Sequence, residues 1–187
     1  MFLENIKTKS DKIFNKYALS LYNIGLTPHR ATFVSFIFTL IAIYFFIKGK
    51  LFLGGIMLIG DYFFDFLDGV IARNTNSKTT TGLLIDKAND LFRVSCWIAI
   101  AYSGNISYML ASLAILTSAL GFFIGNLARL LELKTMNWLP CWADWFLMVG
   151  AILGYIILFA QAMIIVNSVL IVANMLSIII LNTHQRE

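Results

Sequence analysis

The chain has 187 residues, of which 59% are hydrophobic and only 13% are charged. A soluble domain of this length could not bury so much apolar surface, because much of any small fold stays exposed to water. The formal net charge of +4 has no accompanying patch of interleaved basic and aromatic residues, so anionic lipid explains it better than nucleic acid.

Residues 1–28 are predicted to form a juxtamembrane amphipathic helix followed by a turn. They are rich in lysine and lack the long apolar core and small-residue cleavage site of a signal peptide. Apolar side chains recur at loosely helical spacing at Phe2, Ile6, Ile13, Phe14, Tyr17 and Leu21. This pattern is typical of a basic helix on a membrane surface, and a partly disordered polar leader is the alternative.

Residues 29–187 are predicted to form one all-α domain, a bundle of six transmembrane helices. Apolar stretches of about 20 residues recur along it, each long enough to cross a hydrocarbon core of roughly 30 Å. The helices are expected at residues 30–48, 51–73, 82–103, 107–132, 140–161 and 162–183. Short connections favour antiparallel neighbours. Gly121 with Gly125, and Gly150 with Gly154, mark close helix contacts or are chance glycines.

The cationic residues predict the topology. They gather before the first helix, around the second connection (Arg73, Lys78, Lys87 and Arg93) and at the fourth connection (Arg129 and Lys134). Only Lys48 and Lys50 fall on the opposite side. The positive-inside rule therefore places both termini and the second and fourth connections in the cytoplasm.

Five of the ten acidic residues lie between Asp61 and Asp90, within or at the ends of segments that otherwise resemble membrane helices. A carboxylate there is costly unless it is paired, metal-bound or facing water. Asp65 and Asp68 share one helix face, and Asp86 and Asp90 share another. A short polar link folds the two helices together, so the sequence predicts that four carboxylates converge at the cytoplasmic interface.

Three interpretations fit this acidic cluster. Arg73, Lys87 and Arg93 can neutralise the acids as ion pairs. Alternatively, the carboxylates gather one or two Mg²⁺ or Mn²⁺ ions, for which hard oxygen ligands are suited. A proton or cation pathway is the third interpretation. No histidine is nearby, which argues against zinc, and the metal interpretation is favoured over pure ion pairing.

The spacing of these residues resembles a family signature. The segment 65–90 matches D-x2-D-G-x2-A-R-x8-G-x3-D-x3-D at all eight fixed positions, which are Asp65, Asp68, Gly69, Ala72, Arg73, Gly82, Asp86 and Asp90. This is similar to the signature of the CDP-alcohol phosphatidyltransferases, which synthesise phospholipids in membranes. Leu26-Thr27-Pro28, followed by Thr32, resembles the start of that family's first helix, although His29 stands where Asn is common.

The resemblance implies a role for each signature residue. Asp65, Asp68, Asp86 and Asp90 would hold a centre of two Mg²⁺ or Mn²⁺ ions, and Asp90 would also be the general base. In the nucleotide site, Asp68 would be joined by Gly69 and Gly82, which admit the nucleotide, by Ala72, which keeps the wall small, and by Arg73, which meets a phosphate or carboxylate. The substrates would be a CDP-lipid, either CDP-diacylglycerol or a CDP-archaeol-like lipid, and an alcohol, with CMP released. The resemblance also implies a homodimer.

Departures from the family point to an unphosphorylated acceptor such as serine, ethanolamine, choline or a polyol. Members that use a phosphorylated acceptor gather extra cations after the fourth helix and at the start of the fifth. Here Leu127 precedes Ala128-Arg129, and Asp144 stands where a cation is expected. Asp61, Arg129, Lys134 and Asp144 are therefore the candidate acceptor residues. Asp61 is placed either against the acceptor's ammonium group or as a structural partner of a nearby Arg or Lys.

Two rival functions remain. One keeps the same active site but uses CDP-choline or CDP-ethanolamine with diacylglycerol as the alcohol. The other is cation transport, against which the acids cluster at one interface rather than at the bilayer midplane, and the chain has no clear internal repeat.

Overall fold

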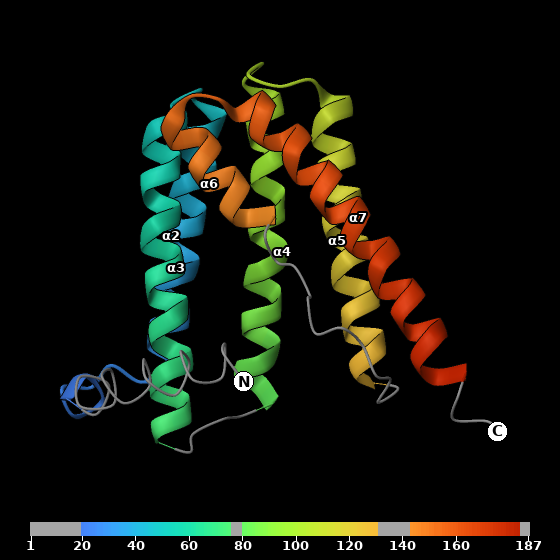
Figure 1. The fold of residues 1–187 in the computed structure, drawn as a ribbon. Helices are drawn as coiled ribbons and strands as arrows, with labels where there is room; N and C mark the ends of the chain where they lie inside the picture. The colour runs from blue at the N-terminus through green and yellow to red at the C-terminus, as the bar shows by residue number, and fades with distance from the viewer. Residues whose placement is uncertain (1–19, 76–79, 131–142, 184–187) are drawn as a thin grey trace. The chain divides into compact units, whose positions relative to one another are not determined.

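The computed structural model describes residues 20–75, 80–130 and 143–183, and this part of the chain contains helices and no strand. The helices, labelled in Figure 1, are α2 (Pro28–Ile47), α3 (Leu51–Asn74), α4 (Thr80–Tyr102), α5 (Tyr108–Leu130), α6 (Ala143–Leu153) and α7 (Ile156–Thr183). The all-α prediction is confirmed. The predicted surface helix at residues 1–28 falls mostly outside the described residues.

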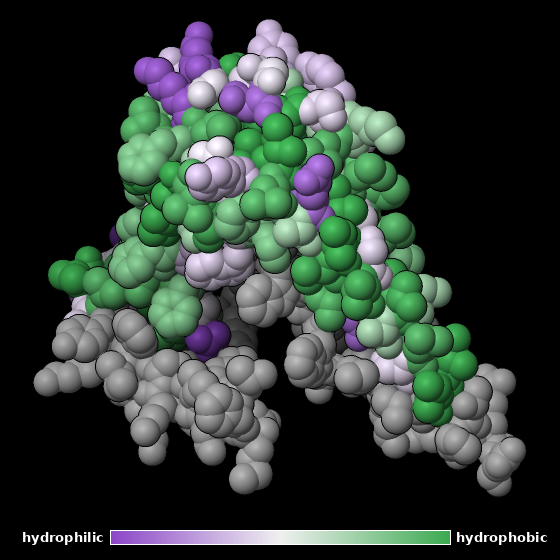
Figure 2. All heavy atoms as spheres, turned by 45° about the horizontal axis from the view of Figure 1, so that its top comes forward, coloured by the Kyte–Doolittle hydropathy of each residue, from purple (hydrophilic) through white to green (hydrophobic). Residues whose placement is uncertain are grey.

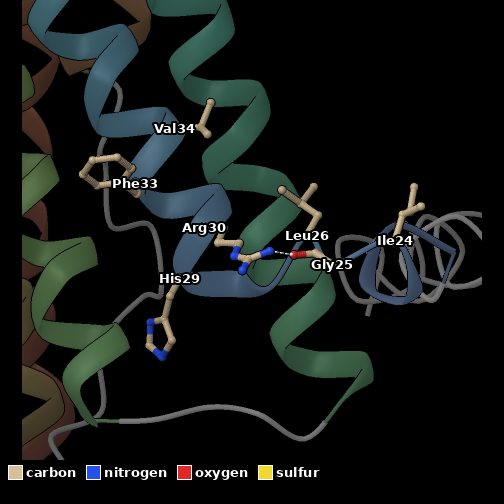
Figure 3. A pocket seen from close by; sticks show the side chains of 7 residues that line it. All are labelled: Ile24, Gly25, Leu26, His29, Arg30, Phe33 and Val34. Carbon is tan, nitrogen blue, oxygen red and sulfur yellow. Dashed lines mark hydrogen bonds between the residues drawn. The ribbon is translucent and has the colours of Figure 1, made fainter.

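The first helix begins at a residue pair suited to starting a helix. Pro28 is the first residue of α2, where a missing N–H costs nothing, and the hydroxyl of Thr27 accepts from the backbone N–H of Arg30 at 3.4 Å. The Arg30 guanidinium folds back to donate to the carbonyl of Gly25 at 2.7 Å, as Figure 3 shows. A shallow hollow surrounds this turn and is lined by Ile24, Gly25, Leu26, His29, Arg30, Phe33 and Val34.

The prediction for the last two helices was wrong at their shared boundary. It placed the connection near Gln161, whereas α6 ends at Leu153 and α7 starts at Ile156. Gly154 has a φ of +75°, a left-handed conformation that ends a helix and that side chains other than glycine rarely adopt. Gln161 is instead an exposed residue within α7. A backbone constraint, and not a break in hydrophobicity, therefore sets this boundary.

Three of the described helices are long and apolar enough to cross a membrane: Pro28–Ile47, Tyr108–Gly125 and Ile156–Ile180. Helices α3 and α4 carry the acidic residues of segment 61–90 together with Arg73 and Arg93, and α6 has only 11 residues. Hydrophobic residues cover much of the face shown in Figure 2. Large apolar side chains such as Phe33, Leu91 and Met109 are 62%, 71% and 74% exposed. This apolar surface is suited to lipid and supports an integral membrane protein. The count of six spans stays a prediction.

The chain divides into two compact units, and each is described by itself. The first comprises residues 1–42 and 57–93, and the second comprises residues 43–56 and 94–187. In the first unit, the rings of Phe38 and Phe64 stack with centroids 5.6 Å apart, which joins α2 to α3. Phe36 meets Phe92 edge-on at 5.0 Å, which joins α2 to α4. Aromatic contacts thus hold three helices together around the acidic segment.

In the second unit, α7 packs against both α5 and α6. Gly150 of α6 lies at a close approach to α7, because a Cβ added there would be 2.7 Å from the Cβ of Phe159. At Gly121 of α5, by contrast, the nearest atom to an added Cβ is the Ile171 side chain at 4.0 Å. Of these two predicted small-residue positions, only Gly150 therefore has no room for a side chain.

Replacing Gly150 with Ala should destabilise the protein, because the Cβ of Phe159 cannot move without its backbone. Overpacking of this kind costs about 1–3 kcal/mol. Gly121→Ala is the matched control and should be neutral or slightly stabilising, since Ala favours a helix over Gly by about 1 kcal/mol. Thermal unfolding of the two variants in detergent measures the difference, and equal midpoints would show that the α6–α7 contact is not tight.

Candidate active site

The centre of the candidate site is Arg93, whose side chain is only 4% exposed. Its Nη2 lies 2.8 Å from Oδ1 of Asp65 on α3, and its Nη1 donates to Oδ1 of Asp90 on α4 at 2.8 Å. Its guanidinium carbon is also 5.2 Å from the centre of the Tyr62 ring. One cation therefore joins two of the predicted signature carboxylates, which come from different helices.

A third carboxylate, that of Asp61, is fully buried and holds the other side of the same guanidinium. Nε of Arg93 lies 2.5 Å from Oδ2 of Asp61, and Nη2 donates to Oδ1 at 3.2 Å. Two hydrogen bonds from one guanidinium to the two oxygens of one carboxylate fix the plane of the guanidinium as well as its position. The sequence left two roles open for Asp61. In the structure, Asp61 is the ion-pair partner of Arg93.

Neutral polar side chains complete the surroundings of Asp61. The hydroxyl of Ser35 on α2 donates to Oδ1 of Asp61, and Nδ2 of Asn89 donates to the same oxygen at 3.3 Å. Asn89 also donates to the Ser35 oxygen at 2.7 Å and accepts from Thr39 at 3.3 Å. Because a buried carboxylate is costly without such partners, these hydrogen bonds offset the cost of burying Asp61 inside the unit.

The hydroxyl of Thr32 on α2 donates to Oδ2 of Asp68 at 2.6 Å. Gly69 follows it, and a Cβ added there would lie 3.2 Å from Nη1 of Arg73. The absence of a side chain at Gly69 thus gives the Arg73 guanidinium its room. Arg73 is exposed at the end of α3, while Ala72 and Gly82 are half-buried.

Some of the predicted site residues fall outside the described side chains. Asp86 lies on α4 one turn before Asp90, but its side chain is not described. The same holds for the side chains of Arg129 and Asp144, and for Lys134 altogether. The acceptor assignments therefore stay predictions.

Sequence reasoning missed Ser35, Thr39 and Asn89. A usable signal was present, because Thr32, Ser35 and Thr39 recur at helical spacing in an otherwise apolar helix and all three are buried. Hydroxyls in apolar helices commonly bond to their own backbone, as Thr32 also does to the carbonyl of Pro28. A hydroxyl that bonds to another helix therefore cannot be distinguished, in the sequence, from one that bonds only to its own backbone.

The donor set suits a hard divalent cation. Every predicted ligand is a carboxylate, a hard oxygen donor, and the carboxylates of Asp61, Asp65 and Asp90 all contact the guanidinium of Arg93. Among the described side chains, no three acids, histidines or cysteines are gathered closely enough to form a ready metal site. The side chain of Asp86, another predicted ligand, is not among those described. The chemistry of the residues present therefore fits Mg²⁺ or Mn²⁺.

Known proteins resemble the chain in both sequence and fold. Over 117 residues it is 31% identical to archaetidylinositol phosphate synthase from Pyrococcus horikoshii, a match that spans 62% of each chain. The chain thus covers less than two thirds of that relative's length.

Crystal structures of phosphatidylinositol phosphate synthase from Mycobacterium tuberculosis share the fold. The complex with CDP-DAG has a TM-score of 0.75 at 18% identity and covers 89% of this chain and 94% of its own. The complex with manganese and citrate has a TM-score of 0.73 at 18% identity, and the match covers 88% of both chains.

The family model for CDP-alcohol phosphatidyltransferase matches residues 25–180, which include α2 to α6, most of α7 and the whole of the acidic site. The predicted resemblance is confirmed, and the chain belongs to the CDP-alcohol phosphatidyltransferase family.

Proposed function

We propose that this protein transfers a phosphatidyl-type group from a CDP-lipid, CDP-diacylglycerol or its archaeol-like counterpart, to the hydroxyl of a small alcohol, with release of CMP. The observation that carries the proposal is the complete eight-residue signature, two of whose carboxylates, Asp65 and Asp90, meet at one buried guanidinium. The CDP-DAG bound to the mycobacterial relative supports a CDP-lipid as the donor.

The reaction is an in-line displacement at phosphorus. The acceptor oxygen bonds to the lipid-side phosphorus, the bond from that phosphorus to the CMP oxygen breaks, and the acceptor's proton must be removed. Asp90 takes this proton as general base, and its contact with Arg93 at 2.8 Å orients the carboxylate toward one direction of approach. Much of the rate comes from holding the two reactants in line.

Asp65, Asp68, Asp86 and Asp90 would hold one or two divalent cations. Bound there, Mg²⁺ or Mn²⁺ would neutralise charge on the diphosphate and on departing CMP. Manganese in the mycobacterial relative supports this assignment. Arg73, exposed beside Gly69, would meet a substrate phosphate.

For the acceptor we propose an unphosphorylated alcohol, on the ground of Leu127 and Asp144, which replace expected cations. A second candidate is an inositol phosphate, which the names of the archaeal and mycobacterial relatives favour. The site is proposed to face the cytoplasm, as the distribution of Lys and Arg predicts, and the protein is proposed to be a homodimer.

Metal-dependent release of CMP is the first expected result. The purified protein with CDP-diacylglycerol, Mn²⁺ and an acceptor should release CMP, and EDTA should abolish the release. Asp90→Asn should lower kcat by about 10²–10⁴-fold, because the amide cannot accept the proton. Asp11→Asn makes the same chemical change outside the signature and should retain activity.

The absence of CMP release with every CDP-lipid would contradict the proposed donor. Release from CDP-choline or CDP-ethanolamine with diacylglycerol would then identify the alternative transferase. If neither substrate set releases CMP, the cluster serves another purpose, and a cation-flux assay in vesicles would test transport.

The choice of acceptor is decided by a substrate panel. We expect CMP release with one of serine, ethanolamine, choline or a simple polyol, and at least tenfold less with inositol phosphate or glycerol phosphate. That ratio is about 1.4 kcal/mol of discrimination, within reach of one missing cation and one repulsive acid. Mass spectrometry of the lipid product measures it, and preference for inositol phosphate would establish the second candidate.

A further inference from the structure

Arg93 and Asp61 are the only buried charged residues in the part of the chain whose side chains are described. The family signature contains neither of them. Asp61 lies one turn before the first signature aspartate, and Arg93 lies almost one turn after the last. The two residues thus flank the signature in the sequence and contact each other in the structure.

The geometry of the pair determines what else Arg93 can reach. Asp61 binds the Nε and Nη2 side of the guanidinium, at 2.5 Å and 3.2 Å. Because the guanidinium is planar and rigid, its orientation on Asp61 also fixes where its other nitrogen lies: Nη1 donates to Oδ1 of Asp90 at 2.8 Å. Nη2 lies 2.8 Å from Oδ1 of Asp65, an ion-pair distance. Asp61 thereby sets the orientation, and Arg93 transmits it to two signature carboxylates.

Asp61 itself is held from two other helices. Ser35 of α2 and Asn89 of α4 both donate to Asp61 of α3, and Asn89 is in turn held by Thr39. Asp61 and Asn89 are 0% and 1% exposed, whereas the side chains of Asp65 and Asp90 are 27% and 23% exposed. The network is thus buried at its Asp61 end and partly exposed where the signature carboxylates lie.

We propose that Arg93 is a positioning residue of the transferase, which holds Asp65 and Asp90 at the spacing needed to bind the divalent cation and to take the acceptor's proton. Its positive charge also offsets the repulsion between the two carboxylates, so the site stays assembled before any cation binds. This inference rests on the proposed function and deepens it. A purely structural role, in which Arg93 only neutralises Asp61, is the alternative that the test must separate.

A double variant separates the two roles. Arg93→Gln alone leaves Asp61 buried without its cation and should lower the thermal unfolding midpoint. Asp61→Asn/Arg93→Gln removes both buried charges and leaves two amides that can bond to each other, so it should recover most of that stability. The recovered fold still lacks the cation that holds Asp65 and Asp90.

Three readouts apply to the wild type and each variant: the thermal midpoint, the Mn²⁺ affinity without substrates by the electron paramagnetic resonance of free Mn²⁺, and kcat with both KM values. In the double variant we expect recovered stability but Mn²⁺ binding weakened by about 10–100-fold, as for other residues that orient metal ligands. We expect a comparable fall in kcat and a smaller change in the KM of the CDP-lipid.

Arg93→Lys keeps the charge but loses the planar fork, and it serves if the double variant does not fold. It should retain a near-normal midpoint and still bind Mn²⁺ at least about tenfold more weakly. Arg30→Gln removes a cation that bonds only to the carbonyl of Gly25 in the described contacts, and it should leave Mn²⁺ binding unchanged.

Recovery of Mn²⁺ affinity and kcat together with stability in the double variant would overturn the proposal, and so would wild-type Mn²⁺ binding in Arg93→Lys. A different outcome is that the wild type releases no CMP, while the variants still bind Mn²⁺ more weakly than the wild type. That outcome would refute the proposed reaction and leave the positioning role of Arg93 in place.

Discussion

The ion pair between Asp61 and Arg93 is the interaction on which the rest of the site depends. Taking two opposite charges out of water is costly, and their attraction compensates only where the geometry is good and further hydrogen bonds satisfy the remaining atoms. Here Ser35 of α2 and Asn89 of α4 provide those bonds to Asp61 of α3. The pair therefore constrains α2, α3 and α4 at once, and within the first unit the exposed ends of the signature take their arrangement from it.

This arrangement reconciles two opposing requirements on a cluster of acidic residues. Carboxylates that bind a cation have to be close together, yet in the absence of the cation they repel one another. A buried guanidinium resolves the conflict, because it attracts Asp65 and Asp90 while it is itself fixed by Asp61. Asp68 additionally accepts a hydrogen bond from the neutral hydroxyl of Thr32 on α2.

The sequence predicted the helical fold, the start of the first helix and the membership of the family, because hydrophobic length and a fixed motif are local properties. It did not predict the end of α6, since the backbone conformation at Gly154 leaves no trace in hydropathy. It named Arg93 as one of three possible partners for the acids, without ranking it above Arg73 and Lys87. Selecting it requires the contacts of Ser35 and Asn89 with Asp61, which join residues 26 and 28 positions apart in the chain.

The early end of α6 has a consequence for α7. With 28 residues and a rise of 1.5 Å per residue, α7 is about 42 Å long, well beyond the roughly 30 Å hydrocarbon core of a bilayer. A helix with such an excess of length accommodates by tilting, and in Figure 1 α7 runs obliquely past α5, its neighbour in the second unit. If α7 crosses a bilayer, its contacts with α5 and α6 would depend on the thickness of that bilayer and hence on the chain length of the surrounding lipids.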